Sequence, residues 1–201
     1  MRGVCLLLNV FTEPKKLKRG PQVITLKDAA MISGLTGLQS GDVVVDAGAG
    51  SGWLAIYLGS IVAPLGKVVS YECREEFASL AEKNVARAGL SEVVEIKRAD
   101  VFCGISETEA DLVTLDLADS DKAVATAFAT LKPGGWCVGY HPCFEQVKKF
   151  VLEAQRVGFE HSQSIEVIVR EILVRDYGCR PATKGLTHTA FLSFERKPKE
   201  K

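Results

Sequence analysis

The sequence has 201 residues, with 25 lysines and arginines against 25 aspartates and glutamates, so its formal net charge is zero. Hydrophobic residues make up 47% and charged residues 25%, which is typical of a globular chain and excludes wholesale disorder. The charge balance excludes a strongly basic coat for nucleic acid but leaves a local basic patch open. No apolar run approaches the roughly 18 residues of a transmembrane helix.

The first twenty residues differ from the rest of the chain. Residues 4–11 form an apolar run that we interpret as a disposable or oligomer-packing strand, because no small-residue cleavage site of a signal peptide follows it. Four basic residues then precede Gly20, namely Lys15, Lys16, Lys18 and Arg19. We therefore expect an N-terminal arm over residues 1–20, one domain over residues 21–197, a charged tail over residues 198–201 and a cytoplasmic location.

Strand and helix patterns alternate from residue 43 onward. Strands are predicted at residues 43–45, 68–71, 93–96, 111–116 and 136–140, and helices at residues 51–62, 74–88, 117–131 and 144–157. A turn is predicted at residues 132–135. The alternation predicts an α/β fold, a mostly parallel sheet with helices on both faces. Two β-rich segments at 165–174 and 189–195 have no helix between them, which predicts one antiparallel strand at an edge.

The strongest functional signal is the D-x-G-x-G-x-G loop formed by Asp46, Gly48, Gly50 and Gly52. A buried strand leads into it and a helix follows, and its glycines permit positive φ and a close approach of a ligand to the main chain. Glu72 ends the next strand, about 20 residues further on, at the spacing of a carboxylate that binds ribose hydroxyls. The pattern predicts a nucleoside-type cofactor. The acid before the loop repels a pyrophosphate and suits a cationic amino-acid end instead.

This loop resembles motif I of class I S-adenosylmethionine-dependent methyltransferases. The resemblance implies a Rossmann-like class I methyltransferase fold with a seven-stranded sheet, and S-adenosyl-L-methionine as the cofactor, converted to S-adenosyl-L-homocysteine. It further implies that Glu72 binds the ribose and that Asp100, after the third strand, flanks the adenine. Other cofactor contacts are expected from Gln22, Ser51, Trp53, Leu54, Val101 and Asp116.

Asp116 ends the fourth predicted strand, where ligands bind in open α/β sheets. The residues after it do not form the pattern of exocyclic-amine methyltransferases. They also lack the paired carboxylates that an oxygen-methylating metal enzyme requires, so no metal site is predicted. A single carboxylate suits a substrate that becomes positively charged on methylation.

Several further segments are more specific than the glycine loop. They are Q-V-I-x-x-K-D-A-A at 22–30, S-Y-E-x-R-E-x-F at 70–77, L-D-L at 115–117, Y-x-P-C-x-x-Q-V at 140–147, R-P at 180–181 and H-T-A-F-L at 188–192. Together they resemble the tRNA (adenine-58-N1)-methyltransferase family, particularly its archaeal members, over residues 13–197. The resemblance implies methylation of N1 of an adenosine in the tRNA T-loop, at position 58 or a neighbour.

By the same resemblance Asp116 is the catalytic residue, accepting a hydrogen bond from the exocyclic amine and stabilising the cationic ring. Tyr140, Arg180 and His188 are expected to contact the substrate. The resemblance also implies tRNA as partner and a homotetramer, for which a Cys143–Cys179 disulfide between subunits is a candidate.

The chain departs from the family pattern at two places, with Thr25-Leu26 where the family has Tyr-Pro, and residues 118–121 where it often has Pro-x-Pro-Trp. The short arm also stands in place of the family's N-terminal β-rich domain. Two alternatives therefore stay open: a small-molecule methyltransferase of the corrinoid-pathway type, and a catalytically inactive RNA-binding partner subunit.

Overall fold

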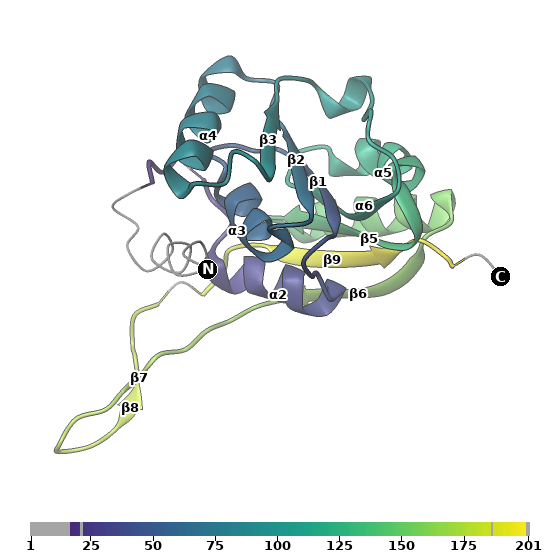
Figure 1. Ribbon diagram of the computed structural model, residues 1–201. Coiled ribbons are helices and arrows are strands. Elements are labelled where there is room, and N and C mark those ends of the chain that lie inside the picture. The colour runs from purple at the N-terminus through teal and green to yellow at the C-terminus, as the bar shows by residue number, and fades with distance from the viewer. Residues whose placement is uncertain (1–16, 21, 186, 200–201) are drawn as a thin grey trace.

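A seven-stranded sheet organises the described residues, which are 17–20, 22–185 and 187–199 of this computed structural model (Figure 1). The order of its strands is β3-β2-β1-β4-β5-β9-β6. The strands are β1 (Val43–Ala47), β2 (Lys67–Tyr71), β3 (Val94–Lys97), β4 (Ala110–Leu115), β5 (Leu131–His141), β6 (Glu160–Glu166) and β9 (Phe191–Arg196). The expected strand at 4–11, the charges Lys15 and Lys16, and residues 200–201 of the tail lie outside the described residues.

The direction of the strands confirms a mostly parallel sheet. Neighbouring strands from β3 to β5 all pair in parallel, whereas β9 pairs antiparallel with both β5 and β6. The antiparallel strand was expected at this edge. Strand β9 is the second strand from this edge rather than the edge strand itself, because β6 pairs with its outer side.

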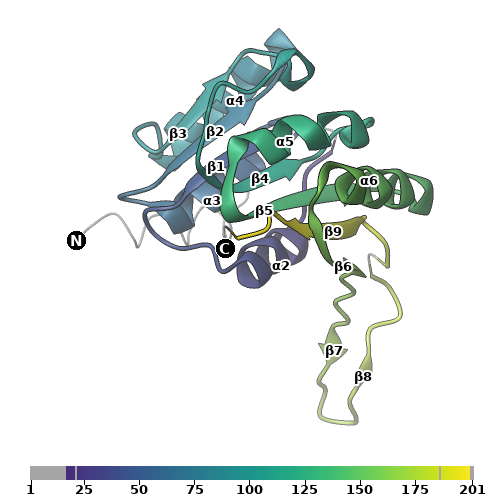
Figure 2. The ribbon, with the colours of Figure 1, turned by 90° about the vertical axis from the view of Figure 1, so that its right-hand side faces the viewer.

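Helices cover both faces of the sheet, as predicted (Figure 2). One face carries α2 (Leu26–Thr36), α3 (Trp53–Val62) and α4 (Glu75–Ala88), and the other carries α5 (Val124–Thr130) and α6 (Phe144–Val157). Successive strand residues alternate between the two faces, so Val44 packs under α3 whereas Val45 packs under α5 and α6. Burial on both faces explains why the strands are continuous β-branched runs.

Two local expectations from the sequence are wrong. The predicted turn at 132–135 lies within β5, because Gly134 and Gly135 exchange backbone hydrogen bonds with Lys197. The predicted strand at 165–174 is shifted, since β6 ends at Glu166. The apolar residues that follow belong to a separate hairpin of β7 (Ile172–Leu173) and β8 (Arg180–Pro181) that projects from the body (Figures 1 and 2).

The helix expected up to Leu131 is confirmed as α5, which ends at Thr130 and is preceded by a short 3₁₀ helix, Ser120–Ala123. A further 3₁₀ turn, Val101–Cys103, follows β3. Among the described residues, no helix has the length and apolar character needed to cross a membrane.

Helix α2, which the sequence patterns did not indicate, is tied to the opposite end of the chain. Asp28 in its first turn is fully buried and accepts hydrogen bonds from Thr25, Lys27 and Thr189, at 2.7–2.8 Å. Lys27 also donates to the Thr189 hydroxyl at 2.7 Å. The K-D-A and H-T-A segments therefore meet in space. At the N-terminal side, Leu17 is buried in the core, so the described part of the expected arm packs on the domain.

Helix α6 offers a direct test of the packing. Phe150 is fully buried on its inner side, whereas Leu152 on the same helix is 55% exposed. Phe150→Ala should lower the free energy of unfolding by about 3–5 kcal/mol, because it removes buried surface and leaves a cavity. Leu152→Ala should change it by no more than about 0.5 kcal/mol. Urea denaturation of both variants measures the difference, and equal losses would contradict this packing.

Candidate functional site

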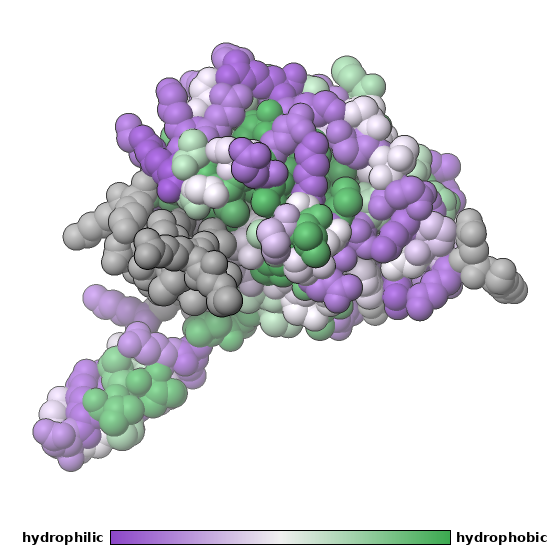
Figure 3. Space-filling model, in the orientation of Figure 1, coloured by the Kyte–Doolittle hydropathy of each residue, from purple (hydrophilic) through white to green (hydrophobic). Residues whose placement is uncertain are grey.

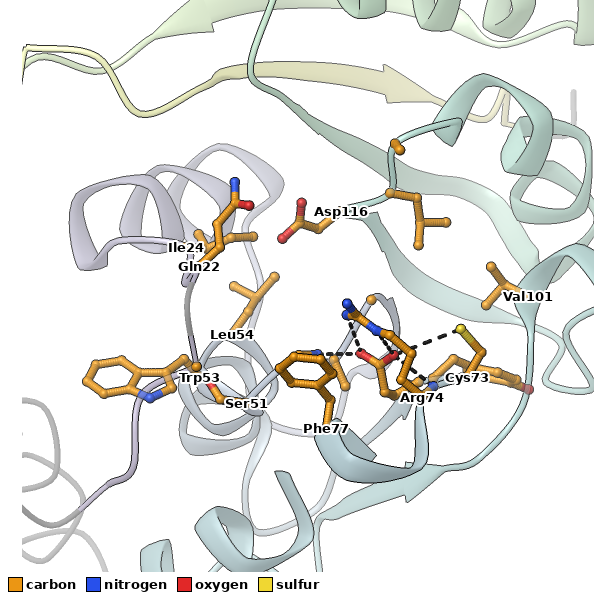
Figure 4. Close-up of a pocket in the computed structure, with 18 of the residues that line it drawn as sticks. Gln22, Ile24, Ser51, Trp53, Leu54, Cys73, Arg74, Phe77, Val101 and Asp116 are labelled. Carbon is orange, nitrogen blue, oxygen red and sulfur yellow. Dashed lines mark hydrogen bonds and ion pairs between the residues drawn. The ribbon is translucent and has the colours of Figure 1, made fainter. Parts of the chain in front are cut away.

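The order of the strands reverses between β1 and β4, and a cleft opens at the carboxyl ends of these strands. From β1 the chain first runs outward to β2 and β3, and then returns to β4 on the other side of β1. Ligands of open α/β sheets bind at such a reversal. The cleft has a volume of about 490 Å³, in the range of small-molecule sites (Figure 4).

The glycine loop forms the floor of the cleft, between β1 and α3. Gly48, Gly50 and Gly52 adopt φ angles of 98°, 52° and 80°, in the region that favours glycine. At Gly48 the constraint is also steric, because a Cβ atom would lie 2.4 Å from the carbonyl oxygen of Asp116. The loop therefore brings the main chain of β1 against that of β4, as the sequence pattern requires.

Glu72 stands at the tip of β2 and is almost entirely buried. Its Oε2 accepts a hydrogen bond from the Gly50 amide at 2.9 Å, and its Oε1 accepts from the Arg74 amide at 3.0 Å and from Arg74 Nε at 2.9 Å. Burial alone raises the pKa of Glu72, but the hydrogen bonds from Arg74 and Gly50 outweigh it, and the pKa lies below its ordinary value. Glu72 is therefore an ionised acceptor at the cleft wall.

Asp46 lies behind the loop, enclosed by the sheet. Its two carboxylate oxygens accept hydrogen bonds from Ser70 of β2 at 2.6 Å and from Thr114 of β4 at 2.7 Å. Burial raises the pKa of Asp46, although these hydrogen bonds oppose the change. Asp46 does not line the cleft, so its influence on a ligand is electrostatic rather than by contact.

Asp116 lies at the other end of the cleft, at the tip of β4. Burial, and second the charge of Asp46, raise its pKa to about 7. A cationic group beside Asp116 would favour its ionised form and lower this pKa. The site thus holds two carboxylates, Glu72 at one end and Asp116 at the other, with different affinities for protons.

The structure places most of the expected cofactor residues around this one cleft. Those that line it are Gln22, Gly48, Gly50, Ser51, Trp53, Leu54, Glu72, Asp100, Val101 and Asp116. Gly52 instead packs against Ala81 of α4, where a Cβ atom would lie 3.2 Å from the Ala81 Cβ. Asp100 also stabilises the 3₁₀ turn that follows it, because its carboxylate accepts a hydrogen bond from the Phe102 amide at 2.9 Å.

The three expected substrate residues lie in three different places. Tyr140 is buried, and burial together with the charges of Asp28 and Asp116 raises its pKa to about 12. His188 forms an ion pair with Glu166 at 2.5 Å and a hydrogen bond to the Pro142 carbonyl at 3.1 Å. Arg180 is exposed on the β7–β8 hairpin and does not line the cleft of its own chain.

Among the cleft residues that were not predicted as site residues are Arg74, Phe77 and Phe102. Arg74 and Phe77 lie at the Glu72 end, where the Arg74 guanidinium is 4.1 Å from the centre of the Phe77 ring (Figure 4). Phe102 follows Asp100 and is 48% exposed. Arg74 and Phe77 belong to the family-specific segment at 70–77, and Phe77 also fits the apolar period of a helix, whereas the only sequence signal for Phe102 was its position just after Asp100.

A nucleoside-type cofactor fits these residues. The cleft combines a carboxylate at Glu72, of the kind that accepts hydrogen bonds from ribose hydroxyls, with apolar walls at Leu54 and Val101 and a second carboxylate at Asp116. The Ser51 hydroxyl is buried at the cleft and has no hydrogen-bond partner among the described residues. Within the same residues, no three His, Cys, Asp or Glu side chains are placed to hold a metal ion.

Comparison with known proteins gives a consistent result. Residues 14–190 match the family described as tRNA methyltransferase complex GCD14 subunit. The tRNA (adenine(57)-N(1)/adenine(58)-N(1))-methyltransferase of Methanocaldococcus jannaschii is 35% identical over 218 residues, covering 96% of this chain and 77% of that protein. The tRNA (adenine(58)-N(1))-methyltransferase of Thermus thermophilus is 34% identical over 177 residues, covering 88% of this chain and 69% of that protein.

The solved structure of a protein from Thermotoga maritima, described as an S-adenosylmethionine-dependent O-methyltransferase, has a fold similar to that of this chain. It superposes with a TM-score of 0.89 at 32% identity, covering 96% of this chain and 72% of that chain.

The electrostatics of the cleft can be tested by titration. The Asp116 carboxyl should titrate with a midpoint of about 7, because it is buried beside Asp46. Asp46→Asn should lower that midpoint by removing the neighbouring negative charge. Asp119→Asn is the matched control, since this exposed carboxylate on the same loop is not a cause of the shift. Carbon-detected NMR measures each midpoint, and a wild-type value near the ordinary value of about 3.9 would contradict the assigned environment.

Proposed function

We propose that this chain, which belongs to the family of the tRNA methyltransferase complex GCD14 subunit, transfers a methyl group from S-adenosylmethionine to N1 of an adenosine in tRNA. The target is the T-loop adenosine at position 58 or a neighbour of it. Relatives from an archaeon and a bacterium, at 35% and 34% identity, are both named as methyltransferases of this position.

One observation carries the proposal. A single cleft joins the glycine loop to a carboxylate at each end, with Glu72 at the tip of β2 and Asp116 at the tip of β4. This arrangement gives a nucleoside cofactor one acidic contact at its ribose and leaves the second acid for the reacting end. Asp100 and Val101 border the cleft between these ends and are proposed to flank the adenine.

When bound, S-adenosylmethionine supplies an electrophilic methyl group on a sulfonium. N1 of adenine carries a free lone pair, so the chain needs no general base to create the nucleophile. We assign Asp116 to the exocyclic amine of the target base, from which its carboxylate accepts a hydrogen bond. Methylation makes the ring cationic, and a carboxylate fixed at a strand tip stabilises that charge as it develops.

The raised pKa of Asp116 fits this role. A carboxylate desolvated in the free chain interacts strongly with a cation that enters the same low-dielectric space. The charge of Asp46 behind the loop acts in the same direction, because it adds negative potential at the reacting end. The two acids thus favour a cationic product over a neutral one.

The target adenosine must leave its stacked position to enter the cleft, at a cost of a few kcal/mol. The charge of Asp116 acts on Tyr140, and Tyr140 is proposed to border the base beside Asp116. His188 lies beyond the carboxyl end of β5 and is proposed to contact the RNA backbone. Arg180 stands away from the cleft of its own chain, so its proposed contact is with substrate held by a neighbouring subunit.

The two alternative functions are less well supported. The inactive-partner hypothesis does not explain why Glu72 and Asp116 stand at the strand tips around one cleft. The small-molecule hypothesis lacks the close similarity that the chain shows to tRNA methyltransferases along most of its length.

We further propose a cytoplasmic enzyme of the archaeal type that assembles as a homotetramer. The β7–β8 hairpin supports assembly, because its apolar side chains lie on a projection outside the core (Figure 3). Ile168, Val169, Ile172 and Val174 are each at least 54% exposed. Both Cys143, before α6, and Cys179, on the hairpin, carry free thiols in the single chain, so they remain available for the proposed disulfide between subunits.

The catalytic assignment is tested on tRNA. Asp116→Ala should lower turnover by about 10²-fold or more, because an electrostatic contact to the developing cation is lost. Cofactor affinity should change much less. Asp119→Ala, which removes an exposed acid from the same loop, should retain turnover. Primer extension detects the product, since a methyl group on N1 blocks base pairing. Wild-type turnover in Asp116→Ala would contradict the assigned role, and an unmodified tRNA with the wild-type chain would favour the small-molecule alternative.

The disulfide is tested by electrophoresis. Oxidised protein should migrate as a covalent dimer without reducing agent and as a monomer with it. Cys143→Ser and Cys179→Ser should each abolish the dimer, whereas Cys73→Ser, at another exposed thiol, should retain it. Only monomer in the oxidised wild type would overturn the proposed pairing.

A further inference from the structure

The carboxylate assigned to the ribose already has a full set of hydrogen-bond donors. The amides of Gly50 and Arg74 each donate to one oxygen of Glu72. The Arg74 guanidinium adds one donor to each oxygen, with Nε at 2.9 Å from Oε1 and Nη2 at 3.3 Å from Oε2. A carboxylate has about four lone-pair sites, so these four N–H groups leave no acceptor for a ligand.

The two kinds of donor differ in how easily they are lost. The amides belong to the glycine loop and to the residue before α4, and they hold the carboxylate in place. The guanidinium belongs to a side chain that is 59% exposed, whereas the Glu72 side chain is 3% exposed. Removing the guanidinium returns a cation to water at low cost, because it is already largely hydrated. It leaves a buried carboxylate that needs two new donors.

A vicinal diol supplies the same two donors. The arginine fork bonds one N–H group to each carboxylate oxygen, and two adjacent hydroxyls can bond in the same way. We propose that the Arg74 side chain occupies the ribose subsite of the free chain, and that the cofactor diol must displace it from Glu72. This inference rests on the proposed function, which assigns Glu72 to the ribose.

The Phe77 ring gives the displaced side chain a place at the rim. The guanidinium carbon lies 4.1 Å from the ring centre, so the cation retains an aromatic contact when it leaves the carboxylate. Arg74 and Phe77 lie together at the end of the cleft opposite Asp116 (Figure 4). Arg74 thus sets the affinity of the cleft for diol-bearing ligands without taking part in methyl transfer.

The test measures binding of S-adenosylhomocysteine by calorimetry at pH 8, well above the lowered pKa of Glu72 in the wild-type chain. Arg74→Met keeps an apolar stem over Phe77 but removes both donors, and it should tighten binding about 3- to 10-fold, since a partly exposed ion pair no longer competes. Arg74→Lys retains one charged donor without the fork, and its affinity should lie between those of the wild type and Arg74→Met. Arg98→Met is the matched control, because Arg98 pairs with Glu75 and Glu82 outside the cleft, and it should bind as the wild type does.

A second readout follows the side chain itself. In the wild-type chain the NMR signal of the Arg74 Nε–H group should change on saturation with S-adenosylhomocysteine, because its hydrogen bond to Glu72 is lost. A retained signal would overturn the displacement. So would unchanged or weaker binding by Arg74→Met, or by Arg74→Lys where the methionine variant does not fold.

The inference and the proposed function fail in different ways. Glu72→Gln should weaken binding. If it binds as tightly as the wild type, or if the wild-type chain does not bind S-adenosylhomocysteine, the assignment of Glu72 is overturned and the inference with it. If Glu72→Gln weakens binding and Arg74→Met does not tighten it, the function stands and only the displacement is overturned.

Discussion

The buried carboxylate of Asp46 sets the geometry of the cleft. A charge away from water requires partners, and here each oxygen is bonded by a hydroxyl on a neighbouring strand, Ser70 on β2 and Thr114 on β4. In the sheet, Asp46 pairs in register with both of these residues. Two residues further on, each neighbour presents an acid, Glu72 and Asp116. One buried group therefore aligns the strand tips that carry the two ends of the site.

The glycine loop completes this arrangement because Gly48 follows two residues after Asp46, level with both acids. The absence of a side chain there lets β1 and β4 approach until the Asp116 carbonyl would collide with any Cβ atom. A chain with the same strands but a larger residue at this position would hold Asp116 further from the loop. The position of the glycine loop and the position of Asp116 thus depend on one backbone contact.

The sequence was informative where function depends on local pattern. The strands around β1, the glycines at positive φ and the acids at strand tips are all marked by spacing along the chain, because parallel strands bring their carboxyl ends to one edge. Arg74 and Phe102 were not predicted as site residues, because the local sequence does not determine the direction in which a side chain points after a strand. Likewise, the contact of Asp28 with Thr189 spans 161 positions. The start of β6 was misplaced because its pattern is polar, as suits an edge strand, while the apolar residues after it serve the hairpin.

The position of β9 has a consequence for how the chain is made. Every residue that lines the cleft lies between positions 20 and 118, and this range also contains β1 and β4, the two strands that flank the cleft. Strand β9 follows β5 and β6 in the chain but lies between them in the sheet, so neither strand has a partner on that side until Phe191–Arg196 has been synthesised. The half of the molecule that carries the cleft can thus assemble before the rest of the sheet is complete. The outer half closes only when β9 is available, and until then the unpaired edge of β5 is exposed to pairing with other chains.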